Sequence, residues 1–566
     1  MDTARSCDLL VAGSGAGGLS AAVVAAELGL RVIVVEKAAQ FGGTTAWSGG
    51  WMWIPRNPLA VGAGIVEDEA APRAYLRHEL GAHYDAARLD AFLAHGPRMV
   101  EFLRARAAIA FIDGNAIPDF HGGAPGAASG GRSVCAAPVD ARILGERLAA
   151  LREPLDLTAF LGMGIAAGAD LRHFLMAMRS WASFRHAARR VAVHLADRLV
   201  HGRGMHLVAG NALVARLLRA ALDRGVELRA GTALTALVRD GTRVTGGRVA
   251  GAGGAETLVA ARGVVLACGG FPHDDARKRA LFAHAPTGRE HCSAAVPSNT
   301  GDGLRLGESA GGVVAADLAA AGAWAPVSLV RRADGSVGHF PHLIERGKPG
   351  LIAVTRAGRR FVNEAGSYYD FMEALFAALP AGAPVEAWLV CDHRFIRRYG
   401  LGHVKPAPLP LGPSLRSGYL QRGATLAALA ARCGIDAAVL ADTVERFNRG
   451  ARHGADDEFG RGTTAYNRVQ GDPTHGPNPC VAPLERAPFY AVRVVPGSLG
   501  TFAGLRTDAH ARVLDAGGTA IAGLYACGND MASVMGGRYP SGGITLGPAL
   551  TFGYLAAHHA AGRAPD

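Results

Sequence analysis

The sequence has few cysteines and none of the spacings in which cysteines act together. Eight cysteines are scattered over 566 residues, without a C-x-x-C pair and without the cysteine–histidine spacing of a zinc site. We therefore expect neither a disulfide framework nor a bound metal. Free thiols are typical of a reducing compartment, so the cytoplasm is the expected location.

Long apolar runs are also missing. No segment approaches the ~18 consecutive apolar residues that a membrane-spanning helix needs. The first predicted strand begins by residue 7, which leaves no room for a cleavable leader. The net charge of +11 is compatible with nucleic acid, a membrane surface or acidic ligands. Because no RNP motif, zinc-finger spacing or helix-turn-helix is recognisable, we expect no nucleic-acid partner.

Glycine and apolar residues are abundant instead. The chain contains 77 glycines, and 49% of its residues are hydrophobic. This composition is typical of a globular protein and far from that of a disordered one. The length indicates several domains.

A dinucleotide-binding pattern occurs near the N-terminus. A predicted strand at 8–13 runs into GSGAGG and a predicted helix, and a second strand, RVIVVE, ends at Glu36. Gly13, Gly15 and Gly18 fit G-x-G-x-x-G, in which the glycines make the tight turn, admit the pyrophosphate and let the helix approach the strand. Glu36 lies where an acid accepts the ribose hydroxyls. This motif alone does not separate FAD from NAD.

Further glycine-rich segments favour FAD. The segment 41–50 (FGGTTAWSGG) suits a second contact with a long cofactor, and predicted strands end in glycines at 262–271 and 523–529. Several loops that are distant in sequence therefore indicate one large cofactor. The residues expected to bind it are Gly13, Gly15, Ala16, Gly18, Glu36, Lys37, Gly43, Thr44, Thr45, Ser48, Gly49, Gly50, Ala267, Gly269, Gly270, Asp302, Gly528, Asn529, Thr545 and Leu546.

Together with NTGDG, GRRFVNEA and the tail YPSGGITLGPALTFGY, these segments resemble the flavoprotein family of fumarate reductases and 3-ketosteroid dehydrogenases. The tail is more similar to the dehydrogenases. Reductases carry an arginine in a segment such as HGANRLGGN, and Pro540 or a near neighbour stands there in this chain, with Arg538 displaced. A flavin-dependent reductase of an unsaturated acid, of the fumarate or urocanate type, remains the alternative.

The resemblance implies roles for a small set of residues. Tyr539 and Gly543 would hold the C3 carbonyl of a 3-ketosteroid. Tyr368 would take the α-proton as the base, with Tyr369 as the alternative, while hydride passes from the adjacent carbon to the flavin. The result is a C=C bond next to the keto group. An external electron acceptor, a quinone being one option, would reoxidise the flavin.

Two departures bear on which bond is oxidised. Related Δ1-dehydrogenases carry a tyrosine in a segment like YPDYHP, and this chain has Phe120 there, at the expected steroid site. His121 beside it could substitute in a proton relay, but a single histidine here is expected to be structural. Ser541, two residues after Tyr539, is similar to the Δ4-(5α)-dehydrogenases and is a further candidate catalytic residue. Together these residues slightly favour Δ4-(5α) over Δ1 chemistry.

A segment at 155–200 interrupts the flavin-binding pattern. Its apolar residues recur at three- and four-residue spacing and are flanked by arginines, which predicts a basic amphipathic helix. Such a helix can lie in an anionic membrane surface, so peripheral contact with the inner membrane face is one reading. A helical hairpin packed on the protein body or at a subunit interface is the other. The apolar residues are Leu171, Phe174, Leu175, Met178 and Trp181.

The expected architecture is an α/β protein with a discontinuous, Rossmann-like FAD-binding domain. It would comprise 1–305, with a helical insertion at about 150–203, and 490–566. An α+β catalytic cap would occupy 306–489 between them. Ligands of such sheets bind outside the carboxyl ends of the strands, so the steroid should lie between the cap and the flavin. A flavin-binding membrane or interaction protein without steroid turnover is a third hypothesis.

Overall fold

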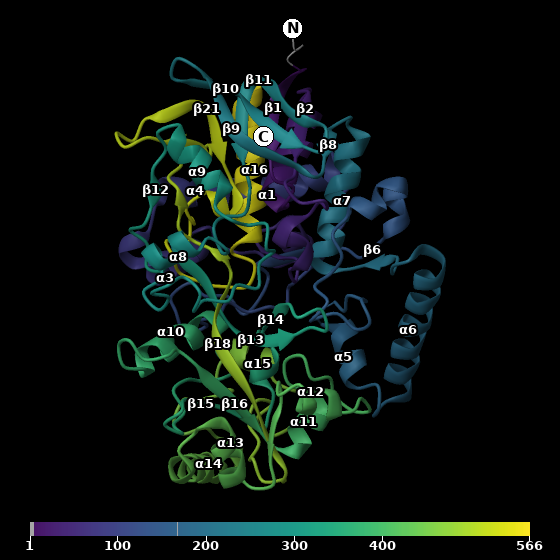
Figure 1. Cartoon of the computed structure of the whole chain (residues 1–566), viewed down its shortest axis with the longest axis vertical. Helices are drawn as coiled ribbons and strands as arrows, with labels where there is room; N and C mark the ends of the chain where they lie inside the picture. Colours follow the sequence, from purple (N-terminus) through teal and green to yellow (C-terminus); the bar gives the residue numbers. More distant parts are fainter. Residues whose placement is uncertain (1–4, 167, 566) are drawn as a thin grey trace.

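The computed structural model describes residues 5–166 and 168–565. Its largest sheet, drawn at the top of Figure 1, has the order β20-β21-β11-β1-β2-β8. In addition, β10 pairs with β11, and β9 pairs with β10. The neighbours from β21 to β8 run parallel. The strands are β1 Arg5–Ala12, β2 Val32–Val35, β8 Glu227–Arg229, β9 Thr232–Asp240, β10 Arg243–Gly251, β11 Gly254–Leu266, β20 Arg512–Leu514 and β21 Ala520–Ala526.

Small residues bring the two ends of the chain together beside this sheet. Helix α1 (Ala16–Glu27) packs against α16 (Leu546–Ala561). A Cβ added to Gly553 would lie 2.4 Å from the carbonyl oxygen of Gly17, so the two helices approach too closely for a larger residue there. Ser20 Oγ also donates to the Leu550 carbonyl oxygen at 2.8 Å. The C-terminal glycine-rich tail therefore enters the site that the N-terminal glycines form.

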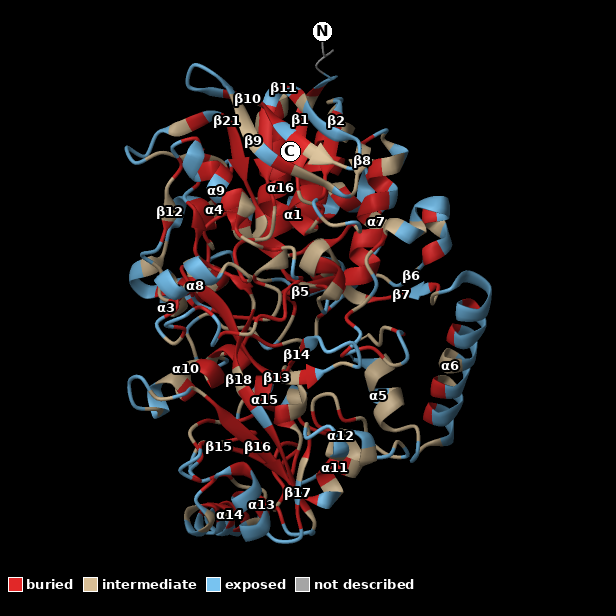
Figure 2. Ribbon diagram, viewed as in Figure 1, coloured by how far each residue is buried: buried red, intermediate tan, exposed pale blue. Residues whose placement is uncertain are grey.

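A second sheet lies below the first in Figure 1, and its paired strands run antiparallel. Its order is β14-β13-β18-β16-β15, with β17 also paired to β18. Figure 2 shows the inner strands of both sheets as buried, with more exposed strands and helices outside them. The strands are β13 Gly322–Arg331, β14 Val337–Pro341, β15 Leu351–Val354, β16 Ala387–Cys391, β17 Gln421–Gly423 and β18 Phe489–Thr501.

The insertion projects from one side of the molecule, where α6 is drawn at the right edge (Figure 1). Strands β6 (Val139–Asp140) and β7 (His206–Leu207) pair at its base. The stripe predicted over 171–181 is not one helix, because α5 (Ala169–Leu175) ends before α6 (Trp181–His201) begins. Ser180 caps the new helix with its side chain and so marks its start.

The remaining elements surround the space between the two sheets. Strands β3, β5 and β4 form a small antiparallel sheet, and α10 packs on β13. Within the described residues, no helix combines the length and apolarity needed to cross a membrane. The mixed α/β fold expected from the sequence is confirmed. These elements are β3 Trp51–Trp53, α2 Pro58–Gly62, α3 Ala70–Leu80, α4 Ala86–Ala105, β4 Phe111–Asp113, β5 Ser133–Ala136, α7 Ala209–Asp223, α8 Asp275–Leu281, α9 Asp302–Ser309, β12 Val314–Ala315, α10 Tyr368–Ala378, α11 His393–Tyr399, α12 Gly412–Arg416, α13 Leu426–Cys433, α14 Ala437–Ala451, α15 Ala465–Gln470 and β19 Gly504–Leu505.

Candidate active site

One cavity of about 1550 Å³ joins the two sheets. At one end it is lined by the carboxyl ends of β1 and β2, represented by Ala12 and Val35. At the other end Tyr368 of α10, Tyr466 of α15 and Leu171 of α5 form its wall. The site therefore lies where ligands of parallel α/β sheets bind, outside the carboxyl ends of the strands.

The sheet end of the cavity has the shape and chemistry that a dinucleotide requires. Gly13 adopts φ 106°, and a Cβ there would lie 2.1 Å from the Ala267 carbonyl oxygen. A Cβ at Gly18 would lie 2.0 Å from the Gly13 carbonyl oxygen, so both positions admit only glycine. The Glu36 carboxylate accepts hydrogen bonds from Ser14 N at 3.1 Å and Ser14 Oγ at 2.6 Å and lines the cavity. An acid at this strand end suits a ribose, and the glycines leave room for a pyrophosphate.

Side chains from distant loops fix the middle of the cavity. Asn299 Nδ2 donates to Thr44 Oγ1 at 3.0 Å and to the Gly269 carbonyl oxygen at 3.1 Å. The Asp530 carboxylate accepts from Cys268 N at 2.5 Å. Burial raises the pKa of Asp530 to about 6. Asn299 and Asp530 were not predicted. Asp530 directly follows the predicted residues Gly528 and Asn529, so its place in the sequence could have indicated it.

Most residues predicted to bind FAD line this one cavity, and two stand behind its wall. Gly18 lies at the contact of helix and strand described above. A Cβ at Gly270 would meet Thr501 Oγ1 at 2.1 Å, so this glycine allows close packing instead. The individual assignments remain predictions. Those on the wall are Gly13, Gly15, Ala16, Glu36, Lys37, Gly43, Thr44, Thr45, Ser48, Gly49, Gly50, Ala267, Gly269, Asp302, Gly528, Asn529, Thr545 and Leu546.

Four aromatic residues meet at the other end. Tyr539 packs edge-on against Tyr368 with ring centroids 5.0 Å apart, and it stacks on Phe120 at 5.8 Å. Tyr466 packs against Phe120 at 4.6 Å. All four line the cavity. Sequence reasoning missed Tyr466, because it lies in a short segment with no motif and far from Phe120 in the chain.

Burial keeps the phenols neutral at ordinary pH. Burial raises the pKa of Tyr539 to about 12, even though hydrogen bonding with Tyr368 and Thr545 works in the opposite direction. Burial and the neighbouring Tyr539 raise the pKa of Tyr368 well above its usual range. A neutral phenol carries a proton that it can donate. Tyr539 is thus equipped to donate a hydrogen bond to an oxygen in the cavity.

The turn that carries Tyr539 is held from several sides. The Pro540 carbonyl oxygen accepts from Phe120 N at 3.0 Å and from the Tyr75 hydroxyl at 2.6 Å. Trp53 N donates to the Gly543 carbonyl oxygen at 3.1 Å. Gly543 adopts φ 98°, and a Cβ there would lie 2.7 Å from the Trp51 carbonyl oxygen. Glycine is therefore required at 543, and its backbone lines the cavity beside Tyr539.

Ser541 and Tyr369 do not belong to the cavity wall. Ser541 is buried beside Asp119, a carboxylate that also accepts from Trp53 Nε1 at 2.8 Å. The Tyr369 hydroxyl donates to the Gly537 carbonyl oxygen at 2.8 Å. Of the two neighbouring tyrosines, Tyr368 is the one that lines the cavity. Tyr368 is therefore the one of the two that can meet a ligand, and Ser541 lies behind the turn that carries Tyr539.

His121 lies between two carboxylates, one on each side of its ring. Its Nδ1 is 2.6 Å from Glu79 Oε2, and its Nε2 is 2.9 Å from Asp370 Oδ2. Burial alone disfavours the imidazolium, but the hydrogen bonds to Asp370 and Glu79 outweigh it and raise the pKa of His121 to about 10. Charged His121 thus fastens the Phe120 loop to α3 and to the start of α10.

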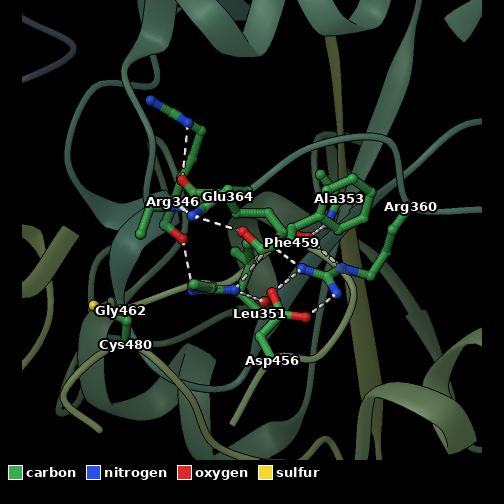
Figure 3. Close-up of polar contacts among 12 residues, drawn as sticks. Arg346, Leu351, Ala353, Arg360, Glu364, Asp456, Phe459, Gly462 and Cys480 are labelled. Atoms are coloured by element: carbon green, nitrogen blue, oxygen red, sulfur yellow. Dashed lines mark hydrogen bonds and ion pairs between the residues drawn. The ribbon is translucent and has the colours of Figure 1, made fainter. Parts of the chain in front are cut away.

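The segment GRRFVNEA forms a buried ionic cluster (Figure 3). Arg360 Nη2 lies 2.7 Å from both Glu364 Oε2 and Asp456 Oδ2. Arg461 Nη1 lies 3.3 Å from Glu364 Oε2, and Ala353 N donates to Glu364 Oε1 at 2.9 Å. The side chains of all four charged residues are almost fully buried. The cluster ties strand β15 to the loop that leads into α10.

A second contact connects the same segment to α15. Asn363 Nδ2 donates to Asn467 Oδ1 at 2.9 Å, and Asn467 Nδ2 donates to the Ala365 carbonyl oxygen at 3.0 Å. Asn467 follows Tyr466, and Ala365 precedes Tyr368 by three residues. The motif therefore supports two of the aromatic residues in the cavity without touching it.

Comparisons with known proteins agree with this geometry. Residues 8–546 match the FAD binding domain family. The chain is 38% identical to a 4-oxocyclohex-2-ene-1-carboxylate 5-dehydrogenase of Sinomonas cyclohexanicum, over 97% of this chain and 93% of that protein. It is 37% identical to a 3-oxosteroid 1-dehydrogenase of Mycobacterium tuberculosis, over 99% of each chain.

A solved structure is similar over nearly the whole length. The crystal structure of 3-ketosteroid Δ1-dehydrogenase from Sterolibacterium denitrificans, in complex with 1,4-androstadiene-3,17-dione, superposes with a TM-score of 0.90 at 37% identity, covering 99% of this chain and all of that one. FAD as the cofactor and an FAD-dependent oxidoreductase as the enzyme class, both expected from the sequence, are confirmed. The chain belongs to the FAD-binding-domain flavoproteins, within the group that contains the 3-ketosteroid dehydrogenases.

Proposed function

We propose that this protein oxidises a 3-ketosteroid and introduces a C=C bond next to its keto group. The observation that carries the proposal is the common cavity, in which Tyr539, Gly543 and Tyr368 face the same space as the dinucleotide cradle. The relatives named above, a steroid dehydrogenase and an oxocyclohexene carboxylate dehydrogenase, are both named for oxidation of ring ketones.

Each residue has a separate task in this reaction. The Tyr539 hydroxyl and the Gly543 N–H donate hydrogen bonds to the keto oxygen and stabilise the negative charge that develops there. Loss of one such donor typically costs ~10²–10³ in rate. Tyr368 takes the α-proton as its phenolate, after its own proton has left for solvent, and because burial raises the pKa of Tyr368 this ionisation adds to the barrier. When bound, FAD supplies the acceptor for the hydride that leaves the adjacent carbon, and an external acceptor, such as a quinone, then removes the electrons.

The 1,2 bond is the better supported site of oxidation. The steroid relative at 37% identity is a 1-dehydrogenase. Ser541, on which the preference for the 4,5 bond partly rested, lies behind the wall and not on it. Phe120 does line the cavity without a hydroxyl, but the Tyr466 phenol packs directly against it. We therefore propose Δ1 chemistry.

The alternative of an unsaturated-acid reductase has less support. Such an enzyme needs a cation that holds the substrate carboxylate next to the reacting bond. Arg538 lies 3.9 Å from Glu373 in an ion pair and is not part of the cavity wall. The neutral donors Tyr539 and Gly543 suit a ketone instead.

Anaerobic mixing with a neutral 3-ketosteroid tests the proposed function. We expect loss of the oxidised flavin absorbance and a product lighter by two hydrogens, with NMR locating the new double bond at C1–C2. A bond at C4–C5 would overturn the choice of position. Retained flavin absorbance with every ring ketone, combined with oxidation of added reduced flavin by fumarate, would support the reductase.

Two further proposals concern the architecture. We propose that 1–305 and 490–566 form a Rossmann-like FAD-binding domain and that 306–489 form the catalytic cap. The separate sheets support two domains, but β18 (Phe489–Thr501) is a central strand of the second sheet, so the chain returns to the first domain only after Thr501. We also propose that 155–200 contacts an anionic membrane surface, because α6 exposes Trp181 and Leu199 next to arginines.

A further inference from the structure

A lysine lines the cavity without a carboxylate partner. Lys348 is half-buried on the cavity wall, and its Nζ donates to the Gly471 carbonyl oxygen at 2.7 Å. Among the described residues no carboxylate oxygen lies within 4.0 Å of it. Burial lowers the pKa of Lys348, as expected for an ammonium group that has lost water without gaining an anion. A partly buried cation of this kind gains free energy when an anion joins it.

The acidic groups nearby are already engaged. Asp472, which also lines the cavity, forms an ion pair with Arg398 and accepts from the Tyr399 hydroxyl at 2.7 Å. These contacts lower the pKa of Asp472 to about 2 despite its burial. Glu345 lies 2.5 Å from His342 Nδ1. Asp472 is paired with Arg398 and Glu345 is hydrogen-bonded to His342; both act on Lys348 from a distance, but neither contacts its ammonium group.

The insertion adds positive charge to the same wall. Arg172 of α5 lines the cavity, and Arg179, in the turn before α6, is close enough to Tyr399 to oppose in small part the rise in its pKa that burial causes. Asp170, the nearby acid on α5, is held by Arg190 at 3.0 Å and by His186 at 2.8 Å. This part of the cavity therefore favours an anion.

Helix α15 connects the aromatic end of the cavity to the lysine. Tyr466 and Gln470 both line the cavity and are one turn apart, which corresponds to about 6 Å along the helix. Gly471, the hydrogen-bond partner of Lys348, follows directly. Lys348 therefore contacts the chain just past the C-terminal end of α15, about one helical turn from Tyr466, while Tyr539 belongs to the aromatic group that Tyr466 joins.

The backbone of Lys348 is held in place by the buried ionic cluster. Arg461 Nη2 donates to the Lys348 carbonyl oxygen at 2.7 Å, and Lys348 N donates to the Glu345 carbonyl oxygen at 3.0 Å. The same arginine contacts Glu364 in the cluster of Figure 3. A cation on a fixed backbone can recognise a ligand at small entropic cost.

We propose that Lys348 binds a carboxylate at the end of the substrate opposite the keto group. The preferred substrate would then be a 3-ketosteroid whose side chain ends in a carboxylic acid. The inference rests on the proposed function, because Tyr539 must hold the keto group at the other end. The ammonium group would donate a charge-assisted hydrogen bond to the acid, either in place of its bond to the Gly471 carbonyl oxygen or in addition to it.

The test compares a 3-ketosteroid side-chain acid with its methyl ester, which has the same rings and no charge. Lys348→Met should lower the ratio of kcat/KM for acid over ester by ~10-fold or more, as expected for loss of a hydrogen bond between charged groups. Lys348→Arg should restore most of the ratio. Lys405→Met is the matched control, because Lys405 Nζ also donates to a carbonyl, that of Leu157 at 3.4 Å, and its pKa is also lowered by burial, but it lies outside the cavity wall.

The results that would overturn the role of Lys348 differ from those that would overturn the proposed function. An equal loss for acid and ester in Lys348→Met, or a wild-type preference for the ester, would overturn the assignment of Lys348. A preference for a monocyclic oxocyclohexane carboxylate over both steroids would also overturn it, since that carboxylate lies one ring away from the keto oxygen. If the wild-type protein oxidises no neutral ring ketone, the proposed function itself fails.

Discussion

The hydroxyl group of Tyr539 is the proposed hydrogen-bond donor to the keto oxygen of the substrate. Its phenol is buried, neutral at ordinary pH and packed against Tyr368 and Phe120. Tyr539→Phe removes the donor and keeps the ring, so packing and FAD content should persist. We expect kcat to fall by ~10²–10³. Stopped-flow measurement of flavin reduction with a 3-ketosteroid checks this, with the flavin-to-protein absorbance ratio as the control for cofactor content. A loss of less than threefold would remove Tyr539 from its assigned role.

His121 acts through position and charge. Because its pKa is raised to about 10, folding gains from the imidazolium fully below the unfolded pKa of ~6.5, and this gain is lost as pH rises through about 10. His121→Gln keeps a donor but not the charge. We expect this variant to be less stable than wild type near pH 6, where the imidazolium contributes fully, and the difference should shrink as pH rises through about 10.

The matched control for His121 is His453→Gln, at a histidine outside the cavity wall. Activity and thermal unfolding of the three proteins, measured from pH 6 to pH 10.5, make the comparison. Equal unfolding temperatures of wild type and His121→Gln near pH 6 would show that the contacts of His121 with Glu79 and Asp370 do not depend on its charge.

At the scale of an element, the loop from β15 to α10 depends on its buried ions. Arg360 faces Glu364 and Asp456, and Arg360→Met leaves Glu364 with Arg461 alone and Asp456 without a cation within 4.0 Å among the described residues. Removing one partner of a buried pair typically costs ~3–5 kcal/mol. The midpoint of urea unfolding should fall accordingly. Arg446→Met, which breaks an exposed pair with Asp442, should cost at most ~1 kcal/mol. Similar midpoints for the two variants would contradict this account of the loop.

The elements that the sequence predicted are those whose signal is local. Gly13, Gly18 and Glu36 lie within one strand–helix–strand unit, so spacing alone indicated the cradle. Tyr466 and Lys348 carry no such signal, because their neighbours come from distant parts of the chain. The residues Phe120 and Tyr466, for example, are in contact but are separated in sequence by more than half of the chain. The helix break at Ser180 was missed for a different reason, since apolar spacing continues through the cap while the backbone does not.

At the scale of the whole molecule, α6 leaves an apolar stripe unpartnered. Trp181 is 76% exposed and Leu199 is 89% exposed, although both are large and apolar. Arg185 and Arg189 lie beside this stripe on the same exposed helix. Anionic headgroups would pair with the arginines while the apolar side chains enter the interface. Because α5 of the same insertion lines the cavity, binding there would bring the site close to the lipid surface in which steroids dissolve.

Flotation with vesicles decides between a membrane contact and a subunit contact. The wild-type protein should float with phosphatidylglycerol vesicles at low salt and much less with phosphatidylcholine vesicles or at high salt, because screening weakens the attraction. Trp181→Ser combined with Leu199→Ser should abolish flotation. Val66→Ser, at an apolar residue 88% exposed elsewhere, should not. If the wild type stays at the bottom of the gradient while light scattering shows a dimer that the double variant dissociates, the stripe is a contact between two copies and the membrane proposal is wrong.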